Sequence, residues 1–138
     1  RFGPLSRRHS VEDVIAALYA TTARARAICD TEEHKSLLTL ILTDGEVMAA
    51  TQGGKELYFS TYKGQCSDRD TCPSLSAECE APTETGFVNH LLISSEPLQG
   101  ENVWEPMAED EAIGVDFRMR LVRSTRGERH LPLAAAAP

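Results

Sequence analysis

Cysteine is the residue type in this sequence with the widest range of possible chemistry. Cys66, Cys72 and Cys79 fall in one segment, and Cys29 lies far upstream. Zinc sites are built from cysteine pairs about two to four residues apart, which this wider spacing does not match. A disulfide needs an oxidising compartment, and the sequence carries no secretory signal. We therefore expect three reduced surface thiols, with Cys29 buried as a small apolar residue at the end of a helical stripe.

The other nucleophilic and basic side chains form no familiar catalytic pattern. The sequence contains four histidines, His9, His34, His90 and His130, and none of them is paired at metal-ligand spacing. His90 falls in an apolar segment, which favours a hydrogen-bonded core histidine over a base or ligand. Ser94 and Ser95 lack the glycine frame of a nucleophile elbow. Glu96 follows a predicted strand and is as consistent with capping that strand as with a site carboxylate.

Composition limits the class of protein. The chain has 138 residues, of which 41% are hydrophobic and 25% charged, as expected for one globular domain. Fourteen basic and 21 acidic residues give a net charge of -7. An acidic chain is a poor general binder of nucleic acid or anionic membranes, and no apolar run reaches the roughly 20 residues of a membrane span. We expect a cytoplasmic protein without a cofactor or a bound metal.

Hydrophobic periodicity predicts one helix and several short strands. Ser10 precedes an amphipathic stripe and is suited to cap a helix that runs to about Ile28. The predicted strands are 37–42, 47–51, 56–62, 87–95 and 113–121. The Asp44-Gly45 pair is a hairpin signal, so the first three strands are expected to form a meander. Residues 63–86 hold three of the cysteines and are expected to form a long surface loop.

Two of the predicted strands are apolar on both faces and need cover on both. This pattern predicts a layered α+β domain with antiparallel sheets. We expect an N-terminal loop at 1–9, a folded region at 10–122 and a frayed tail at 123–138. Trp104 is expected to pack onto a sheet, because a large aromatic ring buries much apolar area.

Four segments, in order, resemble class II glutamine amidotransferase-like proteins. Residues 43–51 (TDGEVMAAT) look like the family's hairpin, and 56–60 (ELYFS) like its next strand. Residues 93–98 (ISSEPL) and 104–107 (WEPM) are similar to two later motifs. The nearest sub-group consists of the fungal glutathione-degrading γ-glutamyl hydrolase subunit and its ergothioneine-pathway relative. The chain departs from the family at Thr39 and Gln52, where the family usually has Asn and Arg, and in its cysteine-containing loop.

The resemblance implies the C-terminal half of an N-terminal-nucleophile hydrolase, an αββα sandwich with two antiparallel sheets between helical layers. In that family an N-terminal cysteine attacks a γ-glutamyl amide and its own α-amino group is the base. The chain begins at Arg1, so we expect the nucleophile in an upstream half or a partner subunit, with no catalytic residue here. The substrate would bind through that missing half. The alternative is a non-catalytic interaction or scaffold module that keeps the same fold.

Overall fold

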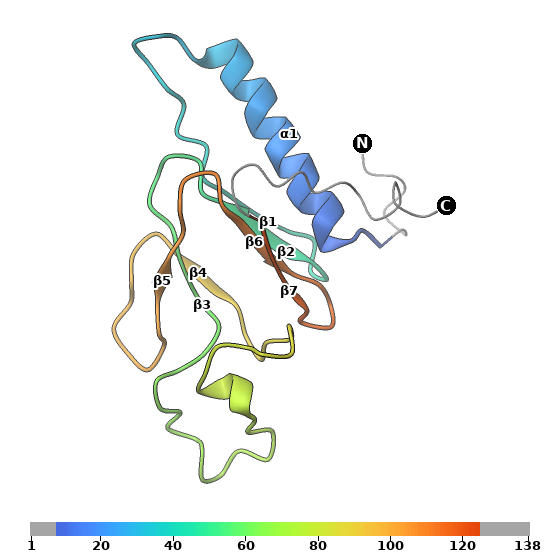
Figure 1. Cartoon of the computed structure of the whole chain (residues 1–138), viewed down its shortest axis with the longest axis vertical. Coiled ribbons are helices and arrows are strands. Elements are labelled where there is room, and N and C mark those ends of the chain that lie inside the picture. The colour runs from blue at the N-terminus through green and yellow to red at the C-terminus, as the bar shows by residue number, and fades with distance from the viewer. Residues whose placement is uncertain (1–7, 125–138) are drawn as a thin grey trace.

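The computed structural model describes residues 8–124, which form one long helix and two antiparallel sheets (Figure 1). The elements in chain order are α1 (Val11–Cys29), β1 (Leu40–Thr43), β2 (Met48–Thr51), β3 (Tyr58–Ser60), the short 3-10 helix η1 (Ala77–Cys79), β4 (Leu92–Ser94), β5 (Glu105–Pro106), β6 (Ala112–Val115) and β7 (Leu121–Ser124). The predicted α+β character is therefore confirmed.

Helix α1 begins and ends where its sequence signals place it. The Ser10 hydroxyl accepts a hydrogen bond from the Asp13 backbone N–H at 3.1 Å, which satisfies one of the free donors of the first turn. Acidic side chains in that turn and Arg26 in the last turn complement the helix dipole. Glu12 is buried and accepts from Arg120 Nη2 at 2.7 Å, which ties the start of the helix to the sheet.

The first sheet, sheet A, has the strand order β1-β2-β6-β7 and lies against α1. Ala49 in β2 is paired with Gly114 in β6, so the two smallest side-chain positions lie side by side under the helix. A Cβ added at Gly114 would lie 2.6 Å from Val11 Cγ2. Glycine at this position therefore allows α1 to pack directly onto the sheet.

The second sheet, sheet B, has the order β4-β3-β5. Phe59 in β3 is 2% exposed and is paired with Ile93 on one side and Glu105 on the other. Its ring lies in the apolar layer between the two sheets, together with Ile113 of sheet A. Residues that alternate with Phe59 point to the opposite, outer face of sheet B.

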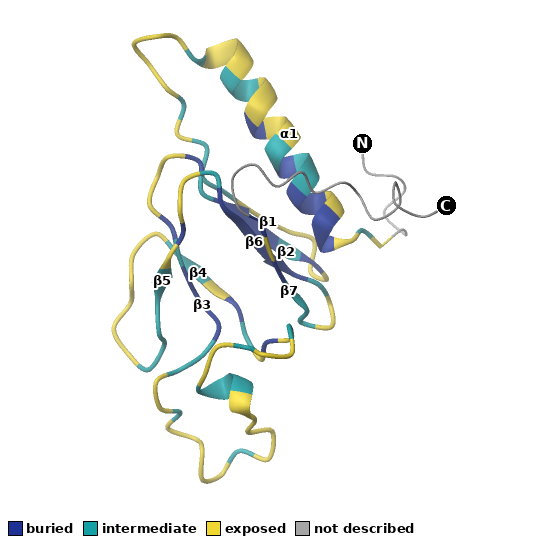
Figure 2. Cartoon of the chain, in the orientation of Figure 1, coloured by how far each residue is buried: buried dark blue, intermediate teal, exposed yellow. Residues whose placement is uncertain are grey.

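The molecule is thus layered as helix, sheet A and sheet B. One apolar core lies between α1 and sheet A, and a second lies between the two sheets. Buried residues line the inner face of α1 and most of β2 and β6, whereas the far end of α1 is exposed (Figure 2). Within residues 8–124, α1 covers sheet A, and no helix of comparable length covers the outer face of sheet B (Figure 1).

The expected three-stranded meander is wrong, because the third strand joins the other sheet. The β1–β2 hairpin forms as predicted, although its loop covers residues 44–47 rather than two residues. The open edge of β2 is taken by β6, and this pairing is extended by a bond from the Gln52 N–H to the Glu111 carbonyl. Strand β3 therefore has no free edge of β2 to pair with.

The single strand expected at 113–121 is also wrong, because the chain turns back within it. The Asp116 carboxylate accepts from the Arg118 and Arg120 backbone N–H groups, and Met119 adopts a positive φ of 63°. These local bonds make a tight turn between β6 and β7.

Strand β7 extends the folded region past the predicted boundary at residue 122. Arg123 and Ser124 belong to β7, and Ser124 is completely buried. The expected tail at 123–138 is therefore wrong for these two residues. The remainder of that segment, like most of the expected N-terminal loop at 1–9, lies outside the described residues.

Candidate functional site

The structure brings three of the four family-like segments together as the three strands of sheet B. Tyr58, from the 56–60 segment, is paired with Ser94 of the 93–98 segment and with Pro106 of the 104–107 segment. Residues 61–92 separate the first segment from the second, and residues 99–103 separate the second from the third, yet all three form one antiparallel sheet. The first segment is the central strand of the sheet, and the other two pair with its opposite edges.

Trp104 closes the loop that joins two of these strands. Its indole Nε1 donates to the Leu98 carbonyl oxygen at 3.0 Å, which links the end of one family-like segment to the start of the next. Trp104 is only partly buried and belongs to neither apolar core. The expectation of a core anchor on the sheet is therefore not met, and the ring shapes the loop instead.

The fourth family-like segment forms the β1–β2 hairpin. The Asp44 carboxylate accepts from the Glu46 and Val47 N–H groups at 2.9 and 2.8 Å, and this bonding holds the pKa of Asp44 below its usual value. At the other end of the hairpin, the Thr39 hydroxyl accepts from the Gly53 and Lys55 N–H groups. Thr39 therefore holds the turn after β2 in place.

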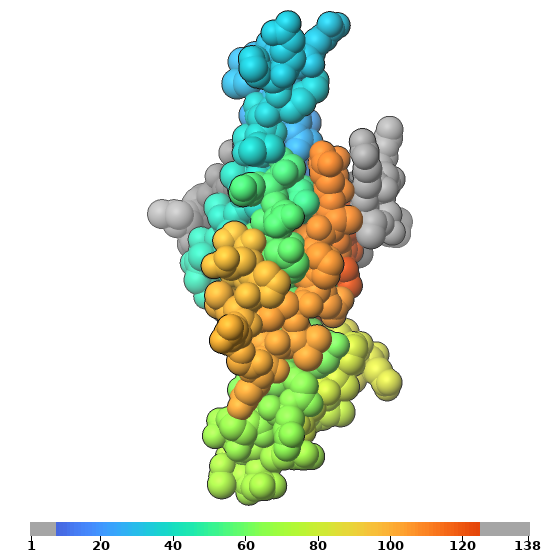
Figure 3. Space-filling model, turned by 90° about the vertical axis from the view of Figure 1, so that its left-hand side faces the viewer, coloured from blue at the N-terminus to red at the C-terminus, as the bar shows by residue number. Residues whose placement is uncertain are grey.

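The cysteine-containing loop at 63–86 forms one end of the molecule (Figure 3). Its start is fixed by a bond from the Lys63 N–H to the Cys79 carbonyl and by an ion pair of 3.0 Å between Lys63 Nζ and Glu101 Oε2. The Cys66 N–H donates to the Glu80 carboxylate at 2.9 Å. The prediction of a long surface loop is confirmed, and these bonds give the loop a defined path.

Cys79 has the strongest set of hydrogen-bond donors among the thiols in this loop. Its Sγ accepts from Asn89 Nδ2 at 2.9 Å and from the Ser76 N–H at 3.4 Å. The Ser76 backbone bond is the main cause that lowers the pKa of the Cys79 thiol, and the Asn89 amide adds to it, while burial opposes both. A thiol held in this way forms its nucleophilic thiolate more readily than an ordinary surface cysteine.

We predict that Cys79 is alkylated by iodoacetamide at a lower pH than an ordinary thiol. Alkylation follows the thiolate fraction, so a lowered pKa moves the rise in rate toward acid. The rate is measured by mass spectrometry of the labelled peptide across a pH series. Asn89→Ala should move that rise toward higher pH, whereas Gln99→Ala, an exposed substitution outside the loop, should leave it in place. A profile of Cys79 that is unchanged in Asn89→Ala would contradict this assignment.

The other thiols differ in part from expectation. Cys66 and Cys72 are partly exposed, and all four cysteines are free. Cys29 is exposed, so its expected burial is wrong. Helix α1 continues past the sheet at that end, where Ile28 is 71% exposed. Within residues 8–124 no group of acidic, histidine and cysteine side chains is arranged to hold a metal ion.

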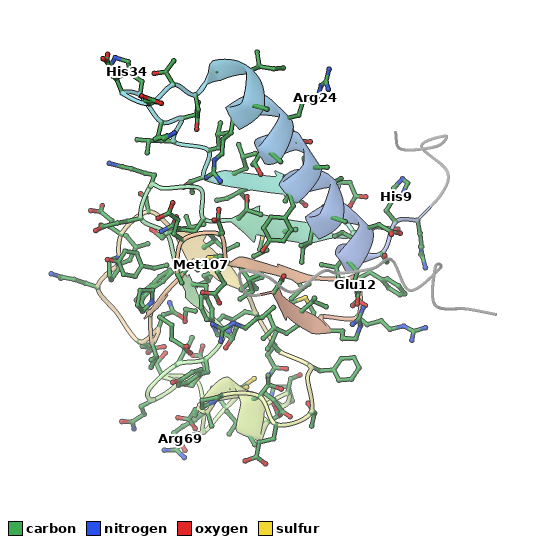
Figure 4. The ribbon with its side chains drawn as sticks, turned by 45° about the horizontal axis from the view of Figure 1, so that its top comes forward. His9, Glu12, Arg24, His34, Arg69 and Met107 are labelled. Carbon is green, nitrogen blue, oxygen red and sulfur yellow. The ribbon has the colours of Figure 1, made fainter. Side chains whose placement is uncertain are left out.

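Within residues 8–124, no histidine forms a hydrogen bond with a thiol, so the structure shows no cysteine–histidine catalytic pair there. His9 and His34 lie at opposite ends of α1 (Figure 4), and His130 lies outside the described residues. His90 is partly buried, and burial followed by the charge of Lys63 lowers the pKa of its ring. Its buried Nε2 has no hydrogen-bond partner among residues 8–124, so the expected hydrogen-bonded core histidine is not confirmed at that atom.

Ser94 and Glu96 are joined by a hydrogen bond in the turn that follows β4. The Glu96 backbone N–H donates to Ser94 Oγ at 3.3 Å, whereas Ser95 and Glu96 are exposed. Within residues 8–124, neither Ser94 nor Ser95 forms a hydrogen bond with a histidine or carboxylate side chain. The expectation that this chain contributes no catalytic residue stays a prediction.

Comparisons with protein-family models, with curated proteins and with solved structures find no match to this chain. Among the described residues, no helix combines the length and the apolar character needed to cross a lipid bilayer.

Proposed function

We propose that the chain is the C-terminal part of a glutamine amidotransferase-like γ-glutamyl amide hydrolase. In this proposal a thiolate outside this chain attacks the γ-carboxamide carbon, the amine or ammonia leaves, and water then hydrolyses the γ-glutamyl thioester. The chain itself supplies α1 and strands of both sheets, which hold the missing half in place. Four free cysteines suit the reducing cytoplasm, which is the compartment we propose.

The observation that carries the proposal is the pairing of the family-like segments in sheet B. Tyr58 has partners from both of the other segments, so three motifs identified separately in the sequence form one structural unit. If the three segments resembled the family only by chance, there would be no reason for them to pair with one another. Because each motif alone is short, this joint placement is stronger support than any single one.

The layers also support the proposal. An αββα sandwich has a second helical layer over the outer face of its second sheet, and the described residues supply only α1, over the first. On the outer face of sheet B, Leu92 is 40% exposed and Pro106 is exposed. A missing half that covers this face would complete the sandwich and bury these side chains.

The test is turnover of a γ-glutamyl amide, followed by release of ammonia or glutamate. The chain alone should show none, whereas the chain combined with an upstream half that begins with cysteine should turn the substrate over. Changing that N-terminal cysteine to alanine should lower the rate about 1,000-fold or more, because the nucleophile is lost.

Two outcomes would contradict the proposal. Activity in the chain alone would overturn it, because no nucleophile is assigned to this chain. A combined protein that folds but never turns over would favour the alternative, a scaffold module with the same fold. Thermal unfolding of the combined protein separates a failure of folding from a failure of chemistry.

A further inference from the structure

Strand β1 is an edge of sheet A and carries exposed apolar side chains. Ile41 and Leu42 are 51% and 41% exposed, and Leu37, just before the strand, is 65% exposed. The stretch from Leu37 to Thr43 contains no charged residue and no proline. Natural proteins protect free edges with charged residues and proline, so an unprotected apolar edge points to a pairing partner.

The other edge of sheet A is already partly occupied. The Leu121 N–H at the start of β7 donates to the Gly86 carbonyl, and Phe87 forms a bridge with Arg120. Arg123 adds a charged side chain to the same strand. Of the two edges of sheet A within residues 8–124, β1 is therefore the one that is open to another strand.

The register of β1 defines which backbone groups are free. The Leu38 N–H bonds to the Gly53 carbonyl, and the Asp44 N–H bonds to the Val47 carbonyl. Both bonds continue the β1–β2 register, so alternate residues from 38 to 44 direct their backbone groups toward β2. The backbone N–H and C=O groups of Thr39, Ile41 and Thr43 then point outward, along the open edge.

The sequence of this edge is symmetric about Ile41. It reads Thr-Leu-Ile-Leu-Thr from 39 to 43, the same in both directions. If two copies pair antiparallel around Ile41, Ile41 faces Ile41, Leu40 faces Leu42, and Thr39 faces Thr43. Each residue then lies opposite a residue of the same type, on the same face of the sheet. Such matched apolar and Thr–Thr cross-strand pairs are favourable.

We propose that β1 is the interface between two copies of this chain, paired antiparallel about a two-fold axis at Ile41. The two copies of sheet A then form one continuous sheet. The outward groups of Thr39, Ile41 and Thr43 bond to those of Thr43, Ile41 and Thr39 in the other copy. Because the pairing uses the open edge of both copies, it closes as a dimer and does not grow into a filament.

The first measurement is the mass of the 138-residue chain in solution, by sedimentation equilibrium over a concentration series. The chain should approach twice its monomer mass of 15.1 kDa at the higher concentrations. Ile41→Lys should give the monomer mass at every concentration, since it places two like charges opposite each other at the axis. Ile28→Lys, the same substitution at an exposed isoleucine on α1, should still form the dimer.

A charge exchange tests the pairing at Ile41 itself. Ile41→Glu alone should be monomeric for the same reason as Ile41→Lys. An equimolar mixture of the two variants should recover the dimer, because opposite charges then lie directly across the axis. Circular dichroism of each variant checks that it is folded, so that loss of the dimer is not loss of structure.

Four results would overturn the proposal: a wild-type chain that stays monomeric, a wild-type chain that forms a continuous series of larger species, an Ile41→Lys dimer, or folded variants that fail to associate when mixed. The interface is independent of the proposed activity. If the chain forms the dimer but the folded, combined protein does not hydrolyse a γ-glutamyl amide, this inference is supported and the proposed function is contradicted. If the chain stays monomeric but the combined protein hydrolyses the amide, the proposed function is supported and this inference is contradicted.

Discussion

Phe59→Ala should lower the free energy of unfolding by about 4 kcal/mol, among the largest effects of any single substitution in this chain. Phe59 is 2% exposed and fills the layer between the two sheets, next to Ile113. Removing the ring leaves a cavity whose walls are strands fixed by their own ladders. Such walls relax little, so the full transfer and cavity costs are expected.

The ring also supports a polar group at the edge of this core. The Arg123 guanidinium carbon lies 4.7 Å from the centre of the Phe59 ring, and Arg123 Nε donates to the buried Glu111 carboxylate at 3.0 Å. Loss of the ring therefore loosens a charge pair as well as the apolar layer. This second effect places Phe59→Ala toward the upper part of the range for phenylalanine substitutions.

Phe117→Ala is the matched control for this prediction. Phe117 is 51% exposed and its ring is contacted by Arg8 and Arg118 at the surface. Its removal should cost less than about 1 kcal/mol, because exposed cation–π contacts are weak. Urea unfolding of both variants measures the difference as a shift in midpoint. Equal effects of the two substitutions would show that the layer between the sheets is not a tight core.

Local signals in the sequence predicted the local elements well. Ser10 and the acidic residues after it define the start of α1, and the Asp44-Gly45 pair defines the β1–β2 turn. Both depend on hydrogen bonds between residues a few positions apart, which the sequence displays directly. The same holds for the loop at 63–86, whose small and polar residues lack any period.

The assignment of strands to sheets was not accessible in this way. Whether β3 pairs with β2 depends on β6, which lies about sixty residues further along and occupies that edge of β2. The turn at Asp116 was hidden because its two flanking strands alternate as one continuous pattern. Cys29 was expected to be buried because periodicity defines the face of a helix, but not the point at which the helix extends beyond its sheet.

The candidate site also has features that the sequence reveals and features that only the folded structure reveals. The family-like segments could be found in the sequence, but their contact in sheet B could not. The donors of Cys79 were missed because Asn89 was expected within a strand at 87–95, whereas the structure begins β4 at Leu92 and leaves Asn89 in irregular chain beside Cys79. A polar side chain on an irregular loop gives no signal of where its amide points, so only the folded chain reveals that contact.

Gly53→Ala is the second substitution with a large expected effect, and we expect it to cost about 3 kcal/mol or more. Gly53 is buried, and an added Cβ would lie 2.0 Å from the Leu38 carbonyl oxygen and 2.2 Å from the carbonyl carbon. Both are backbone atoms, so no side chain can rotate away. The strand that leads into β1 or the turn after β2 has to shift.

That shift would also break the hydrogen bonds that meet at Gly53. Its N–H donates to Thr39 Oγ1 at 3.0 Å, and its carbonyl accepts from the Leu38 N–H at 2.8 Å. Gly64→Ala is the control, since the nearest atom to its added Cβ is Val103 Cγ2 at 3.8 Å, an ordinary contact. It should change stability by less than about 0.5 kcal/mol. If urea unfolding gives similar midpoints for the two variants, the close approach of Leu38 to Gly53 is wrong, and with it the register that leaves Thr39, Ile41 and Thr43 free along the edge.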